Sequence, residues 1–195
     1  MNKKYQKIWE LALPYQDARD DAGHGQIVTD YAEKLSEIEQ VVVDIAVPAA
    51  ILHDIGWSQL SRSERFLIFD KRNAAEARLQ ARYHHQEQSV RLGREILEQV
   101  DYPQQFIDPI LDIISEHDTR NGYHTKEEAV MRDADKLWRV SKIGFYDDIR
   151  QSNDTPENYH HQLASKIRDP NFLFLESSRK IAEEELSARL REFSS

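Results

Sequence analysis

Residues 45–52 constrain the fold more than any other segment, because they carry no charged side chain and end directly at the pair His53-Asp54. A helix that is apolar on all sides belongs in a protein core. Burying an imidazole and a carboxylate there without partners would cost several kcal/mol of folding free energy. Neutral histidine and ionised aspartate are both metal ligands, so a metal ion is the simplest partner for both. The segment therefore predicts a buried metal site at its end.

The size and composition of the chain indicate one soluble domain. Its 195 residues are enough for a sizeable core, and 39% hydrophobic with 31% charged residues is typical of a soluble globular protein. No run approaches the length of about 20 apolar residues that a membrane span needs, and no apolar segment behind residues 1–5 resembles a signal peptide. The chain has no cysteine, which excludes disulfides and thiolate metal sites and fits a reducing cytoplasm. We expect a cytoplasmic protein with no membrane partner.

The formal net charge of −9 argues against extended nucleic-acid binding, because a nucleic-acid surface needs positive charge. The charge does not exclude small phosphate esters, since a bound metal ion can reverse the local field. The expected partner is therefore a small molecule. The sequence does not indicate an oligomeric state.

Strand-like alternation is nearly absent, and only six glycines and six prolines interrupt the chain. We predict an all-α protein in which residues 1–195 form a single domain and the last helices pack on the same core. The segment around residues 151–156 is predicted as a loop, and Pro156 can start the helix that follows. The predicted helices cover residues 3–13, 25–39, 44–54, 73–82, 84–100, 104–118, 126–140, 157–167 and 172–192.

Helical periodicity separates inward-pointing histidines from solvent-facing ones. His24 begins an apolar stripe, and His117 shares a face with three isoleucines. In the adjacent pair, His85 aligns with Ser89, Leu92 and Ile96, whereas His84 aligns with polar side chains. His24, His85 and His117 are therefore candidate site residues. We assign no role to His124, His160 and His161.

A further carboxylate is expected from the segment around residue 134. Asp135 shares a helical face with Trp138, and Asp133 shares one with Leu137. Both faces are partly apolar, so periodicity does not choose between the two aspartates.

Each candidate also has an ordinary structural interpretation. A single histidine on an apolar stripe is more often a hydrogen-bonded core residue than a ligand, and His53-Asp54 could be a polar pair at a helix end. Asp133 and Asp135 could solvate a helix start. Together, however, these residues would be many costly burials for one small domain unless they converge on one site. Nitrogen and oxygen ligands without sulfur favour Mn, Fe, Co, Ni, Zn or Mg over a structural zinc site.

The ordered set His24, His53-Asp54 and Asp135 resembles the H…HD…D signature of the HD-domain superfamily of metal-dependent phosphohydrolases, which are helical bundles. The sequences GHGQIV at residues 23–28, AILHDIG at 50–56 and ADKL at 134–137 resemble its three motifs. The resemblance covers about residues 20–140, and about residues 141–195 would be a C-terminal helical extension. The ADKL match favours Asp135 over Asp133.

The resemblance implies that His24, His53, Asp54 and Asp135 hold a divalent metal ion. His85 begins HQEQS, which is similar to the H-x-x-x-[GS] element of members with a second metal, and His117 resembles their other added histidine. These two would hold a second ion or the substrate phosphate, with Asp54 bridging two ions. Trp138 departs from the pattern, since relatives carry aspartate or another small polar residue there.

The implied activity is hydrolysis of a phosphoester or phosphoanhydride of a nucleotide, or of a related small phosphate, by metal-activated water. His53 and Asp54 would be central to catalysis, and Lys136 is a candidate partner for the substrate phosphate. Two alternatives stay open, namely a di-iron HD-type oxygenase and a non-catalytic metal-binding sensor module. Further basic residues that could surround the mouth of the site are Arg62, Arg65, Lys71 and Arg72.

Overall fold

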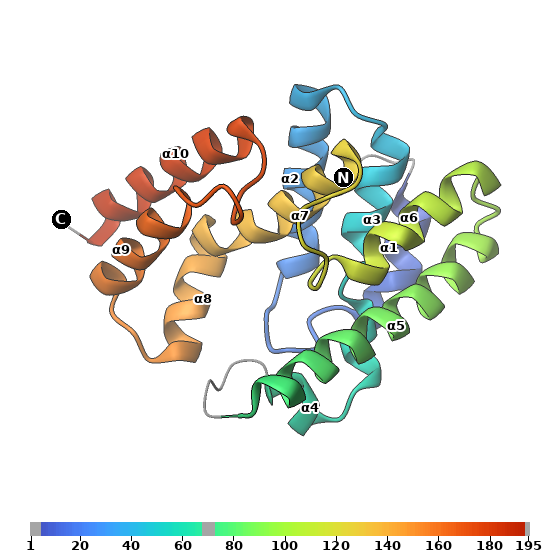
Figure 1. Cartoon of the computed structure of the whole chain (residues 1–195), viewed down its shortest axis with the longest axis horizontal. Coiled ribbons are helices and arrows are strands. Elements are labelled where there is room, and N and C mark those ends of the chain that lie inside the picture. The colour runs from blue at the N-terminus through green and yellow to red at the C-terminus, as the bar shows by residue number, and fades with distance from the viewer. Residues whose placement is uncertain (1–4, 68–72, 194–195) are drawn as a thin grey trace.

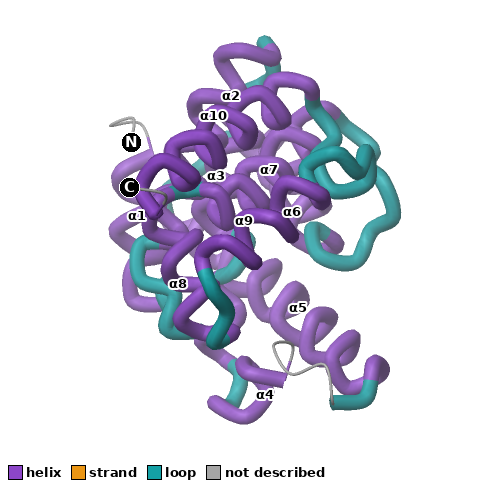
Figure 2. The backbone as a smooth tube through the Cα atoms, turned by 90° about the vertical axis from the view of Figure 1, so that its left-hand side faces the viewer, coloured by secondary structure: helices purple, strands orange, loops and turns teal. Residues whose placement is uncertain are grey.

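The computed structural model describes residues 5–67 and 73–193, which form helices joined by loops and turns, with no strand among them (Figure 2). The prediction of an all-α protein is confirmed. The described helices are α1 (Gln6–Ala12), α2 (His24–Glu39), α3 (Val43–Leu52), α4 (Arg62–Leu67), α5 (Ala75–Gln99), α6 (Gln104–Glu116), α7 (Lys126–Leu137), α8 (Lys142–Ser152), α9 (Pro156–Lys166) and α10 (Glu176–Phe193), with short 3₁₀ helices η2 (Leu13–Tyr15), η3 (Ile55–Gln59) and η4 (Trp138–Val140).

Helix α3 lies in the middle of the bundle and packs against α1, α2, α6 and α7 (Figure 1). Its residues 46–52 are all buried, as the uncharged run predicts. A helix surrounded in this way buries apolar side chains in every direction, which stabilises the fold. It also sets the last residues of α3 deep inside the protein.

A proline inside α3 is accommodated by a side chain from another element. Pro48 has no backbone N–H to donate to the carbonyl oxygen of Asp44, one turn earlier. The hydroxyl of Tyr102 donates to that oxygen at 2.9 Å, and the hydroxyl of Tyr5 donates to the Asp44 carboxylate at 2.6 Å. The first turn of α3 is therefore anchored to segments far away in sequence.

The structure differs from the predicted helices at one expected break and in two additional helices, besides shifts of a few residues at helix ends. The expected break between residues 82 and 84 does not exist, because no glycine or proline lies near residue 83 and helix α5 runs through it without interruption. Helices α4 and α8 were not predicted, since neither has a clear apolar stripe. Both carry cap signals instead. The backbone N–H of Ser61 donates to Glu64 at 2.9 Å, as in a capping box, and the N–H of Gly144 donates to the hydroxyl of Ser141 at 3.1 Å. Pro156 begins α9, as expected.

Helices α8, α9 and α10 lie together on one side of the bundle (Figure 1). Helix α10 packs against α9 and also against α2 and α7. Buried residues such as Leu163 and Ile181 belong to the same hydrophobic cluster as Leu52 and Leu137. Among the described residues, no helix combines the length and apolar character that a membrane crossing requires.

Candidate metal centre

Two helices end at the site in the same way. His53 follows the last residue of α3, and His117 follows the last residue of α6. The Nδ1 atom of His53 donates to the carbonyl of Ala50 at 2.8 Å, and Nδ1 of His117 donates to that of Ile114 at 2.9 Å. These bonds fix the tautomer, so that in the neutral rings both Nε2 atoms present a lone pair. A hydrogen bond from the ring nitrogen that does not bind the metal is the usual means of orienting a metal-binding histidine.

The four residues predicted for the first ion come together. Nε2 of His24 lies 3.3 Å from Nε2 of His53. Oδ2 of Asp54 is 3.5 Å from each of these nitrogens, and Oδ1 of Asp135 is 3.4 Å and 3.6 Å from them. Residues from α2, α7 and the end of α3 thus form one cluster, called here the first donor group.

A second donor group lies on the other side of the same aspartate. Nε2 of His85 and Nε2 of His117 are 3.3 Å apart, and Oδ1 of Asp54 is 3.5 Å and 3.4 Å from them. Oδ2 of Asp118 lies 3.9 Å from His85 Nε2. His85 and His117 therefore point into the same centre as His53, whereas His84 is half-exposed and lies 3.5 Å from the carboxylate of Glu64.

Asp54 joins the two groups because its two oxygens face different ones. Its backbone (φ −106°, ψ 0°) lies in the bridge region between helix and strand, which is common at active sites. The indole N–H of Trp57 donates to Oδ1 at 3.1 Å, and Arg19 donates to Oδ2 at 2.6 Å. Burial acts to raise the pKa of Asp54, but Arg19 and His53 outweigh burial and hold it well below its usual range. The carboxylate therefore stays ionised.

Burial and neighbouring charges also shift the pKa values of His53 and His85. Burial acts to lower the pKa of His53, but the carboxylates of Asp54 and Asp135 outweigh it and raise the pKa to about 9. Burial lowers the pKa of His85. Without metal, the first group therefore holds a proton that an incoming cation would replace, and the second group favours a neutral ring.

The donor atoms fit a divalent metal ion in distance and in kind. Metal–ligand bonds of about 2.0–2.2 Å place two ligands of one ion no more than about 4.4 Å apart. In the first group the two histidine nitrogens lie 3.3 Å apart, and each lies 3.4–3.6 Å from an oxygen of Asp54 and an oxygen of Asp135. Nitrogen and oxygen donors without sulfur suit Mn, Fe, Co, Ni, Zn or Mg. The set His85, His117 and Asp118 is close enough to hold an ion as well.

A cavity of about 70 Å³ opens onto this centre. Trp138 forms one wall and packs edge-on against His24, with 5.1 Å between the ring centroids. The indole thus stands where relatives are expected to have a small polar residue, and it narrows the space beside the first group. The cavity is lined by Arg19, Asp21, His24, Asp54, Arg82, Asp118, Asp135, Trp138, Arg139, Asp147, Asp148 and Gln151.

The basic residues at the cavity differ from those that the sequence indicated. Arg62 is exposed, and the guanidinium of Arg65 donates to the carbonyls of residues 18, 58 and 60, which makes it a structural clamp. Lys71 and Arg72 lie outside the described residues. Lys136 does not line the cavity; its ammonium lies 4.4 Å from the ring centroid of Phe174, and burial lowers its pKa.

The two aspartates of α7 have different surroundings. Asp135 reaches the first donor group, as described above. Asp133 is fully buried and accepts the backbone N–H groups of Phe174 and Leu175 at 2.9–3.0 Å. It therefore ties the segment before α10 to α7. Of the two aspartates, Asp135 is the one that lies at the first donor group.

Sequence reasoning missed several residues of the centre. Asp118 had a readable signal, since His117-Asp118 is a second His-Asp pair behind an apolar helix, like His53-Asp54. Trp57 had none, and neither did Arg19. Arg19 lies in the polar stretch QDARDD at residues 16–21, which reads as a solvated loop.

Comparison with known families gives one match: the HD domain family model matches residues 22–139. The matched region contains both donor groups and ends just before α8. Comparisons with curated proteins and with solved structures gave no match.

Proposed function

The chain belongs to the HD-domain family of metal-dependent hydrolases, and we propose that it hydrolyses a phosphoester or phosphoanhydride of a nucleotide or a related small phosphate. The observation that carries the proposal is the position of Asp54 between two donor groups, with one carboxylate oxygen 3.5 Å from His24 and His53 and the other 3.4–3.5 Å from His85 and His117. No serine or cysteine nucleophile is required for this chemistry.

The bound divalent ion would supply an activated water and polarise a phosphoryl oxygen. The residues of the chain hold and orient the reactants. His24, His53, Asp54 and Asp135 would ligate the ion, and His85 and His117 would hold a second ion or the phosphate. His53 and Asp54 are the proposed catalytic core, because hydrogen bonds fix both side chains: His53 donates to the carbonyl of Ala50, and Asp54 accepts from the indole of Trp57.

Arginines at the cavity, each paired with an aspartate, are the proposed partners of a phosphate group. Arg19, Arg82 and Arg139 all line it, and arginine matches phosphate with paired N–H donors. Lys136 is a weaker candidate for binding phosphate than these arginines, since it lies beside Phe174 and does not line the cavity. A cavity of about 70 Å³ has room for a phosphoryl group and water, whereas pockets that enclose a whole drug-sized ligand measure about 300–1,000 Å³. The rest of the substrate would lie towards the mouth.

A second candidate function is a di-iron oxygenase of the HD type. The second donor group is the observation behind this alternative, because a site with two adjacent metal ions suits oxygen chemistry as well as hydrolysis. Iron content together with oxygen consumption separates the two activities. A non-catalytic metal sensor is the third alternative, and it would bind metal with neither activity.

The test is metal analysis of the purified protein, followed by a phosphate-release screen across nucleotides with Mn, Co, Ni and Mg. His53→Ala and Asp54→Ala should each lose metal and hydrolysis while the helical circular dichroism signal survives. His84→Ala is the matched control, because its half-exposed ring faces Glu64 and not the centre. Full metal occupancy with wild-type turnover in Asp54→Ala would contradict the proposal.

A further inference from the structure

Arg19 lies on a loop, residues 16–23, whose backbone is specifically shaped. Three of its residues, Asp17, Asp20 and Gly23, have left-handed φ values of 56°, 59° and 87°. Such conformations are costly for residues other than glycine and persist where the surrounding structure demands them. The carboxylate of Asp17 accepts the backbone N–H of Gly23 at 3.1 Å and closes the loop. The loop directs Arg19 inward, towards the donor groups.

The guanidinium of Arg19 is held on three sides. Its Nη2 atom lies 2.6 Å from Oδ2 of Asp54 and 3.1 Å from Oδ2 of Asp21. Its Cζ atom lies 5.0 Å from the ring centroid of Trp57, whose ring also stacks on His85 with 4.0 Å between centroids. The side chain is only 14% exposed. A buried, paired arginine of this kind is a fixed part of the centre and not a mobile surface charge.

The same carboxylate oxygen serves Arg19 and the first donor group. Oδ2 of Asp54 is the atom that lies 3.5 Å from Nε2 of His24 and 3.5 Å from Nε2 of His53. An ion bound by these residues would sit about 2.0–2.2 Å from that oxygen. The guanidinium and the ion would then be two cations on one oxygen, and in a buried site their repulsion is only weakly screened.

We propose that Arg19 is a resident counter-cation of the metal centre: it competes with the metal ion for Asp54 and transfers to the substrate's phosphoryl group when both are bound. The transfer rests on the proposed function, because it requires a phosphate in the cavity. Arg19 lines that cavity beside Asp54. A phosphate brings negative charge to both cations and relieves their repulsion. Metal and phosphate therefore bind cooperatively, and each raises the affinity of the other by the same factor.

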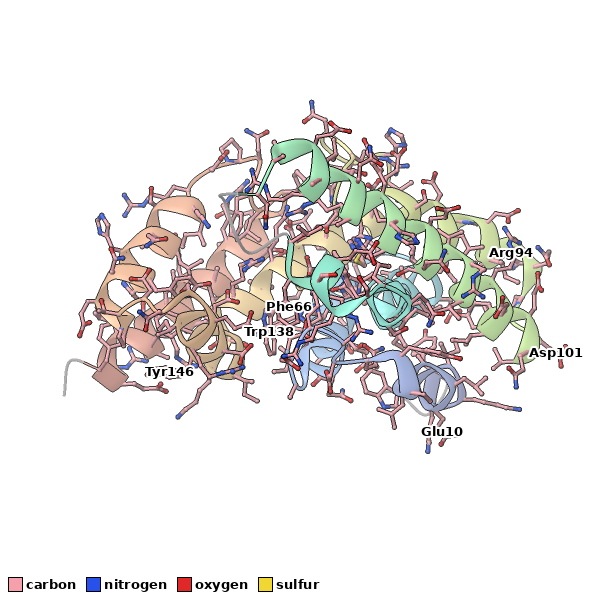
Figure 3. All side chains as sticks on the ribbon, turned by 90° about the horizontal axis from the view of Figure 1, so that it is seen from below. Glu10, Phe66, Arg94, Asp101, Trp138 and Tyr146 are labelled. Carbon is pink, nitrogen blue, oxygen red and sulfur yellow. The ribbon has the colours of Figure 1, made fainter. Side chains whose placement is uncertain are left out.

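The experiment is a calorimetric titration of Mn²⁺ with and without inorganic phosphate, in the wild-type protein and in Arg19→Gln. In the wild type, phosphate should tighten Mn²⁺ binding by about tenfold, which is within the usual range of coupling between sites. Arg19→Gln should bind Mn²⁺ about tenfold more tightly in the absence of phosphate, and should lose the effect of phosphate. Arg94→Gln is the charge-matched control. It lies on α5 far from Trp138, which marks the cavity (Figure 3), and should behave as the wild type does.

A second variant keeps the proposal testable if Arg19→Gln does not fold, as judged by circular dichroism. Arg19→Lys retains the competing charge but loses the forked donor, so Mn²⁺ affinity should stay within about threefold while phosphate affinity falls about tenfold. Weaker Mn²⁺ binding in Arg19→Gln would overturn the proposal, because Arg19 would then only orient Asp54. Unchanged phosphate coupling in Arg19→Gln, unchanged phosphate affinity in Arg19→Lys, or no coupling in the wild type would overturn it too. The two proposals can fail separately. If Mn²⁺ and phosphate bind cooperatively but the protein releases phosphate from no ester, the proposed hydrolysis is refuted while the role of Arg19 stands.

Discussion

Replacing Gly56 with alanine should separate two elements that carry the metal centre. Gly56 lies in η3, directly behind His53-Asp54, and faces α5. An added Cβ atom would lie 2.0 Å from the carbonyl oxygen of His85 and 2.4 Å from the backbone nitrogen of Ser89. Both are backbone atoms of a helix and cannot rotate away. Because side-chain carbons essentially never approach other heavy atoms closer than 3.0 Å, η3 and α5 must move apart by about 1 Å.

The expected magnitude follows from two losses. Overpacking a close contact typically costs about 1–3 kcal/mol, and the hydrogen bond from the Gly56 N–H to the Ser89 hydroxyl, 2.8 Å long, is strained or broken at a cost of about 1–3 kcal/mol. We expect the free energy of unfolding to fall by about 3 kcal/mol, which corresponds to a drop of about 6–12 °C in Tm for a chain of this size. His85 moves with α5, away from Asp54, so metal held by the second donor group should weaken as well.

The assay is urea unfolding combined with metal stoichiometry, and Gly93→Ala is the matched control. Gly93 lies in α5, the helix that Gly56 faces, and its added Cβ would meet nothing closer than 3.4 Å, the distance to a methyl group of Leu111. Alanine also favours a helix over glycine by about 1 kcal/mol, so Gly93→Ala should be as stable as the wild type or slightly more so. A Gly56→Ala protein with wild-type stability and full metal content would refute the reasoning, and so would an equal loss in Gly93→Ala.

Three other predictions address the centre itself. Asp135→Asn should lose metal, whereas Asp133→Asn should keep metal and lower the free energy of unfolding by about 1–3 kcal/mol, because Asp133 accepts backbone N–H groups before α10. Metal analysis and urea unfolding test this, and metal loss in Asp133→Asn but not in Asp135→Asn would mean that the ligand is assigned to the wrong aspartate. His85→Ala should lower the number of Mn²⁺ ions bound by calorimetry, and His84→Ala should not; equal stoichiometry in both would exclude a second ion at His85. The pKa of His53 is raised from 6.5 to about 9 in the folded metal-free protein, so its protonation stabilises the fold below about pH 6.5 and this contribution is lost as the pH rises through about 9. Mn²⁺ must displace that proton, so Mn²⁺ affinity should rise between about pH 6.5 and 9, and a flat profile would contradict the raised pKa.

The parts of the fold that the sequence predicted well are those with strong hydrophobic signals. The uncharged run of α3 and the apolar faces of α2 and α6 predicted buried helices, and their inward faces carried His24 and His117 to the centre. Periodicity identifies which side of a helix is buried. It therefore also identifies a polar residue on that side, which must find a partner inside the protein.

The parts that were missed have polar sequences whose structure depends on tertiary contacts. Helix α8 has no clear apolar stripe, and its cap at Ser141 is a local signal that a hydrophobic pattern does not contain. Arg19 is an extreme case. Its position depends on a loop with left-handed residues and on the ring of Trp57, which is distant in sequence. Charged residues in a polar loop are usually solvated, so no local rule places this one at the centre.

The division between predicted and missed residues follows the chemistry of the site. The proposed ligands are histidines and aspartates on or next to helices with buried faces, where an unpartnered polar group would be costly and the pattern is therefore informative. The outer cavity wall is different, because Asp147, Asp148 and Gln151 come from α8, beyond the matched residues 22–139. Arg139 lies 2.9 Å from Asp148 and links that wall to η4. The donor groups within the matched residues thus open into a cavity whose wall includes residues of α8, which lie beyond the family match.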